Sequence, residues 1–147
     1  MYPDSGDERL RYRIQTTQEG EINMFDEIPF STLISKTLTK IEVNDDKDVM
    51  TFRCDDGTVY NLYHFQDCCE SVGIEDIIGN LDNLIGTPIV MAEEVNDAEG
   101  DRKDEWDDSF TWTFYKLATV KGYVTIRWYG TSNGYYSESV SFEEVKA

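Results

Sequence analysis

The sequence predicts an α+β fold, in which an antiparallel sheet of about seven strands carries short helices on one face. Most of the chain alternates apolar and polar residues with the two-residue period of strands. The middle of the chain instead spaces its apolar residues as a helix does. A length of 147 residues is typical of one domain. We therefore expect a polar leader over residues 1–28, which can be partly ordered, and a single α+β domain over residues 29–147.

Three strands are expected in the first half of the domain, over residues 37–43, 49–54 and 58–63. A short helical turn over Ser31–Ile34 precedes them. Between the second and third strands, Asp55-Asp56-Gly57 indicates a tight hairpin, because glycine supplies the positive φ that such turns need. The pattern therefore predicts a three-stranded meander.

The middle segment has a different apolar spacing, which predicts two short helices over residues 74–78 and 80–85. Gly86 and Pro88 are expected to end the second helix. A strand over residues 89–95 follows. The apolar residues that set the spacing are Cys68, Cys69, Val72, Ile74, Ile77, Ile78, Leu81, Leu84 and Ile85.

The C-terminal third is predicted to be entirely β, with strands over residues 110–120, 123–129 and 135–142. The pair Asn133-Gly134 indicates a turn between the last two strands. Gly134 is therefore expected to have a positive φ.

Charge is the most distinctive feature of the composition: 30 acidic residues against 13 basic ones give a net charge of −17. Such a surface repels nucleic acid and anionic membrane, and it favours cationic partners. We therefore expect no direct nucleic-acid binding and no membrane binding. A loop over residues 96–108 is dense in acids and is the candidate partner-binding surface, unless it serves solubility alone. Its candidate residues are Asp97, Glu99, Asp101, Asp104, Glu105, Asp107 and Asp108.

A second candidate is the cluster His64, Asp67, Cys68, Cys69 and Glu70, which would suit a metal- or thiol-dependent enzyme. Adjacent cysteines point about 100° apart on a helix and about 180° apart on a strand, so both do not easily reach one ion. They also rarely form a disulfide. The favoured interpretation makes Cys68 and Cys69 core residues of a reduced, cytoplasmic protein without a cofactor.

A third candidate is an aromatic strip with nearby cations, which would suit base stacking and phosphate binding in a ligand pocket. The plainer interpretation assigns Trp112 and Phe114 to the core. The possible pocket residues are Trp112, Lys116, Arg127, Tyr129, Tyr135 and Tyr136.

Long stretches of the chain resemble one protein family. They are YHFQDCCESV at residues 63–72, IEDI at 74–77, LIGTPI at 84–89, TWTFYKLAT at 111–119, IRWYG at 126–130 and SNGYYSESV at 132–140. Here the chain is similar to uncharacterised proteins encoded by bacteriophages and prophages, over roughly residues 30 to 145. The resemblance implies genetic context only. Together with the reduced setting expected from the cysteines, this context leads us to expect the host bacterial cytoplasm. It implies no catalytic role.

The leading functional hypothesis is an acidic, phage-encoded binding protein that counters a host antiviral system. It would act as an inhibitor of the anti-CRISPR type or as a nucleic-acid mimic, and its partner would be a host protein with a basic groove. One alternative is a protein that sequesters a small nucleotide signal in the aromatic strip. The other is the metal- or thiol-dependent enzyme centred on His64–Glu70. No enzymatic activity is expected under the leading hypothesis.

Overall fold

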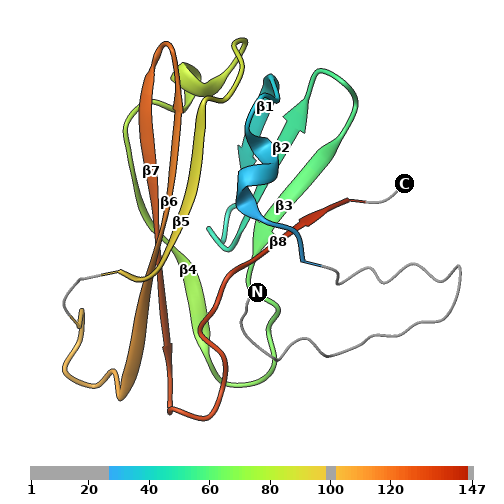
Figure 1. Cartoon of the computed structure of the whole chain (residues 1–147). Coiled ribbons are helices and arrows are strands. Elements are labelled where there is room, and N and C mark those ends of the chain that lie inside the picture. Colours follow the sequence, from blue (N-terminus) through green and yellow to red (C-terminus); the bar gives the residue numbers. More distant parts are fainter. Residues whose placement is uncertain (1–26, 99–101, 146–147) are drawn as a thin grey trace, which may run out of the picture.

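The computed structural model describes residues 27–98 and 102–145, so the predicted leader lies almost entirely outside the described residues (Figure 1). These residues form two four-stranded antiparallel sheets, packed face to face. The first has the order β1-β2-β3-β8, with β1 Leu38–Val43, β2 Val49–Cys54, β3 Val59–Tyr63 and β8 Ser141–Glu144. The second has the order β4-β7-β6-β5, with β4 Ser71–Ile78, β5 Met91–Ala98, β6 Ser109–Thr119 and β7 Gly122–Ser132.

The expected α+β class is wrong, because the described part of the chain is a two-sheet β structure of eight strands without α-helices. Its helical segments are two single 3-10 turns, η1 (Phe30–Leu33) and η2 (Leu81–Leu84). Nowhere in these residues is a helix long and apolar enough to cross a membrane.

The core lies between the sheets and receives side chains from both. Phe52 and Phe142 come from the first sheet, and Tyr115 and Trp128 come from the second. Phe30 of η1 joins the two sets, since its ring centroid lies 4.8 Å from that of Tyr115 and 5.1 Å from that of Phe142. Such edge-to-face contacts stabilise aromatic cores beyond simple area burial. η1 therefore closes one side of the sandwich.

The strands β1, β2 and β3 lie where the alternating pattern predicts them, and the predicted hairpins are confirmed. Gly57 has φ +91° in the turn between β2 and β3, and Gly134 has φ +96° in the turn after β7. Both glycines adopt the conformation that other residues avoid.

The helix predicted over residues 74–78 is wrong, because this segment is the second half of β4. A bulge between Ile74 and Asp76 inserts one residue into the ladder with β7. The residues of β4 that pack on the core are Val72, Ile74 and Ile77. The step of three between the last two imitates helical spacing, which explains the error. The second predicted helix, over residues 80–85, is the single turn η2.

The strand predicted over residues 135–142 is also wrong in its first part. After the turn at Gly134 the chain does not fold back on β7, but crosses to the first sheet and forms only β8 beside β3. The opposite crossing, from β3 to β4, runs over residues 64–70. The two crossings meet where the His64 Nδ1–H donates to the Ser139 carbonyl oxygen, at 2.6 Å.

Candidate functional site

The predicted acidic loop joins β5 to β6. The structure describes its second half, residues 102–108, in which Asp104, Glu105 and Asp108 are exposed and Asp107 is half-buried. Asp97 belongs to the end of β5 and its side chain is outside the description; Glu99 and Asp101 lie outside the described residues. The described carboxylates form no ion pair with a described basic residue.

The two basic residues of this loop face the outer surface of the second sheet. The Arg102 guanidinium lies 5.6 Å from the centroid of the Phe110 ring. The Lys103 ammonium pairs with the Glu75 carboxylate on β4 and lies 5.3 Å from the centroid of the Tyr129 ring. Cation–π and ion-pair contacts therefore hold the loop on the sheet. Both cations of the loop are therefore engaged by groups of the sheet, while Asp104, Glu105 and Asp108 are exposed.

The Tyr129 hydroxyl closes the loop into a defined turn. It accepts a hydrogen bond from the Lys103 backbone N–H at 3.0 Å and donates one to Asp107 Oδ2 at 2.7 Å. Burial raises the pKa of Tyr129, the Lys103 N–H lowers it, and the Asp107 carboxylate raises it again. Inside the turn, Asp104 accepts from the backbone N–H groups of Trp106 and Asp107, with its side-chain and main-chain oxygens respectively. We call residues 103–107 the clamped turn.

Under and beside this turn lies the aromatic strip. Trp112, Lys116, Arg127 and Tyr129 share the outer face of β6 and β7, as predicted for a pocket, whereas Tyr135 and Tyr136 lie in the crossing after β7. The Trp112 and Tyr129 rings pack against each other at 4.7 Å between centroids. They retain only 6% and 9% of their surface exposed.

Of the two cations of the strip, Lys116 and Arg127, the second is engaged by an aromatic ring and a carboxylate. The Arg127 guanidinium lies 4.9 Å from the Trp112 centroid and donates to both oxygens of Asp76, at 2.6 and 2.9 Å. These hydrogen bonds lower the pKa of Asp76 and raise that of Arg127. The plainer interpretation of the sequence, which assigned Trp112 and Phe114 to the core, is therefore wrong, because neither belongs to the core between the sheets. They build a second, smaller aromatic cluster on the outer face.

Strand β4 also contacts a second acidic segment along its edge. The Ile74 backbone N–H donates to the Lys47 carbonyl at 2.7 Å, so the turn over residues 44–48 lies along the free edge of β4. The next residue, Glu75, holds Lys103 of the clamped turn. The turn over residues 44–48 thus contacts Ile74, and the clamped turn contacts the next residue of the same strand, Glu75. Sequence reading missed this juxtaposition of Asp45, Asp46 and Asp48 with the loop, and it missed the exposed Trp106.

The cluster over residues 64–70 is arranged around a buried carboxylate. Glu70 is 5% exposed, and its oxygens accept from the Asp67 N–H at 2.8 Å, from the Cys68 N–H at 2.9 Å and from the His64 Nε2–H at 2.6 Å. Burial would raise the pKa of Glu70, but these three donors together lower it to about 2. The other ring nitrogen, His64 Nδ1, lies 2.6 Å from the Ser139 carbonyl oxygen, so the ring contacts both crossings.

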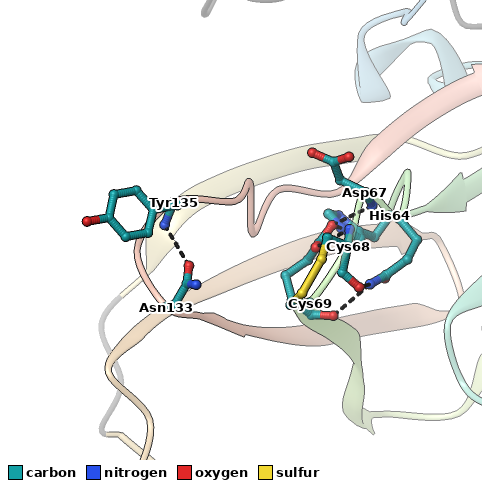
Figure 2. The surroundings of a disulfide bond; sticks show 8 residues. His64, Asp67, Cys68, Cys69, Asn133 and Tyr135 are labelled. Carbon is teal, nitrogen blue, oxygen red and sulfur yellow. Dashed lines mark hydrogen bonds and ion pairs between the residues drawn. A yellow bond between two sulfur atoms is a disulfide. The ribbon is translucent and has the colours of Figure 1, made fainter.

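Figure 2 shows this crossing with its two adjacent cysteines. Both cysteines are exposed, and a disulfide joins them. Their prediction as core thiols is therefore wrong; the buried free cysteine is Cys54. Within residues 27–98 and 102–145, no group of three or more His, Cys, Asp or Glu side chains is placed to hold a metal ion. His64 joins Glu70 of its own crossing to the Ser139 carbonyl of the other.

Comparison with known proteins gives one match. The model of a family described as a domain of unknown function, DUF7448, matches residues 31–142. No curated protein and no solved structure matches the chain. The matched region begins in η1 and ends in β8, so it includes both sheets and the clamped turn. The chain therefore belongs to the DUF7448 family, an uncharacterised family as the sequence motifs suggested.

Proposed function

We propose that this protein is an acidic binding protein that occupies a basic groove of a partner protein in place of nucleic acid. The observation that carries the proposal is the division of charge in the loop over residues 102–108. Its two cations are held against the sheet, by Phe110 for Arg102 and by Glu75 and Tyr129 for Lys103. Three carboxylates of the loop are exposed, at Asp104, Glu105 and Asp108, while Asp107 is half-buried and accepts from the Tyr129 hydroxyl.

The charge spacing of this loop suits such a role. Four of the five residues 104–108 are acids, and the turn closed by the Asp107 N–H and the Asp104 carbonyl gathers them in one place. A single nucleic-acid strand carries one phosphate per about 3.4 Å of axis. A second acidic turn, over residues 44–48, lies at the edge of β4, where the Lys47 carbonyl accepts from the Ile74 N–H. A groove lined with Lys and Arg would be attracted by the same field that attracts phosphates.

The resemblance to phage and prophage proteins supports a specific setting for this activity. A phage protein that imitates nucleic acid would act in the host bacterial cytoplasm and inhibit a nucleic-acid-binding protein of an antiviral system. A small-nucleotide pocket in the aromatic strip has less support, because Trp112 and Tyr129 are largely buried and the Arg127 guanidinium is engaged by Asp76.

The test is affinity capture from a bacterial lysate, with the protein immobilised and the captured proteins identified by mass spectrometry. Bound proteins are released by salt from about 50 mM to about 500 mM, since screening shortens the reach of charge to less than about 10 Å over this range. We expect a basic nucleic-acid-binding protein that leaves as salt rises. Its association should slow about tenfold or more when the loop acids are neutralised by Asp104→Asn, Glu105→Gln, Asp107→Asn and Asp108→Asn.

A matched control removes the same number of charges elsewhere, through Asp55→Asn, Asp67→Asn, Asp82→Asn and Glu93→Gln, all exposed and distant in sequence from the loop. In both variants the net charge changes from −17 to −13. Equal slowing by both variants would show that only overall charge matters. A partner that binds equally at low and high salt would refute the mimicry.

A further inference from the structure

Trp106 stands apart from the other two tryptophans of the chain. It is 79% exposed, whereas Trp112 and Trp128 are 6% and 0% exposed. Its ring makes no aromatic or cation contact with a described residue. A large indole left in water costs solvation free energy that burial would recover. Exposed tryptophans that become buried in a partner pocket are among the strongest contributors to protein interfaces.

The clamped turn fixes the backbone from which this side chain projects. The Tyr129 hydroxyl bonds both ends of the turn, at Lys103 and at Asp107, and the Asp104 carboxylate accepts from the Trp106 N–H itself. Lys103 adds its ion pair with Glu75. The turn is therefore held at four points, and the indole lies at its tip. A turn whose backbone is already ordered loses less entropy when a partner binds.

The chemical neighbourhood of the indole is that of a base in a nucleic-acid strand. A flat aromatic ring stands between carboxylates on both sides, in the order Asp104, Glu105, Trp106, Asp107, Asp108. A nucleotide in a single strand likewise presents an aromatic face between two phosphates. Base-paired nucleotides hide their faces in the stack, so an isolated ring with flanking charges resembles unpaired nucleic acid.

Resting on the function proposed above, we propose that Trp106 acts as the base of a single-strand mimic. It inserts into a partner slot that normally stacks an unpaired base, while the flanking carboxylates contact the Lys and Arg residues that normally hold phosphates. The partner is thus a protein that binds single-stranded nucleic acid, with an aromatic slot between cations. An indole in such a slot gains stacking and cation–π contacts together.

The experiment compares wild-type protein with Trp106→Ala on the partner that salt elutes from the lysate. As a matched control, Tyr123→Ala removes another exposed aromatic, 70% exposed, from a site on β7 outside the acidic loop. We expect Trp106→Ala to weaken binding about 30-fold or more and Tyr123→Ala to leave it unchanged. Trp106→Phe, which keeps a flat ring, should retain most of the affinity.

Displacement by oligonucleotides tests the single-strand character directly. The probes are oligo-dT of about 15 nucleotides, an abasic phosphodiester of equal length and a duplex of equal charge. Oligo-dT should release the partner at a concentration at least about fivefold lower than the abasic chain, because each stacked base adds affinity. Equal release by the two chains, or full binding by Trp106→Ala, would overturn the inference and leave charge mimicry intact. If the duplex displaces the partner at a lower concentration than oligo-dT does, the inference is also overturned. If no partner shows salt-sensitive binding, the proposed function itself is refuted.

Discussion

The buried carboxylate of Glu70 gives a quantitative test of how the two crossings are held together. Its pKa is lowered from 4.5 to about 2 because three N–H donors outweigh the effect of burial. Each pKa unit corresponds to about 1.4 kcal/mol, so the ionised form stabilises the folded protein by about 3 kcal/mol more than the protonated form. Because the pKa in the folded state is the lower one, this stabilisation is complete above about pH 4.5. It is lost as the pH falls towards about 2.

The perturbation is Glu70→Gln, which keeps the size of the side chain and removes its charge. At about pH 7 we expect the variant to be less stable than wild type by about 3 kcal/mol in urea unfolding monitored by tryptophan fluorescence. The difference should shrink as both proteins are acidified from about pH 5 to about pH 2, because protonated wild type then resembles the variant. The stability of wild type and of Glu70→Gln is compared at the same pH, so the contribution of the many other acids to the free energy of unfolding cancels in the difference.

A control in the same crossing is Asp67→Asn, since the Asp67 side chain is exposed while its backbone N–H bonds Glu70. Its effect should be small and the same at every pH. A Glu70→Gln penalty that stays constant from about pH 6 to about pH 2 would refute the reasoning. It would show that the hydrogen bonds to Glu70 do not depend on its charge.

Two further substitutions test local geometry. Gly134→Val should lower the free energy of unfolding by more than about 1 kcal/mol, because a φ of +96° is strained for a branched residue. The cost comes from the backbone alone, since no atom lies within 4 Å of the new Cβ. An unchanged urea midpoint would contradict this prediction. Tyr129→Phe removes the hydroxyl that bonds Lys103 and Asp107, so it should cost about 1–2 kcal/mol and speed amide hydrogen exchange in residues 102–108. Exchange as slow as in wild type would show that the turn is held by its other contacts.

The parts of the fold that sequence predicted are those formed by local patterns. The strands β1, β2 and β3 follow one another with short turns, and their alternation is undisturbed. Strand β4 was missed because its bulge changes the spacing of core residues from two to three. The division into two sheets was missed because Asn133-Gly134 is followed by a crossing and not by a paired strand. Sequence patterns mark where a chain turns, but not which strand it pairs with next.

The candidate site was predictable in composition and not in geometry. The acids of the loop were recognised from their density alone. Their orientation depends on Tyr129, whose partners Lys103 and Asp107 are 26 and 22 residues away in the chain. The cluster around His64 and Glu70 was also recognised, but as a possible metal or thiol site. Only the burial of the carboxylate and the exposure of the cysteines show that the acid, and not the thiols, organises this crossing.

The structure also shows where basic residues offset acids in a chain with a net charge of −17. Several of its few cations are bound to acids on or beside the sheets, in the pairs Arg127–Asp76, Arg53–Glu42, Lys36–Asp56 and Lys103–Glu75. These pairs offset part of the acidic charge of the strands, while exposed acids such as Asp104, Glu105 and Asp108 form no described ion pair. Ionic strength should therefore act mainly on what the turns attract, since exposed pairs contribute little to stability. A rise in salt that releases the partner while the urea midpoint barely changes is the behaviour expected of a charged surface built for binding.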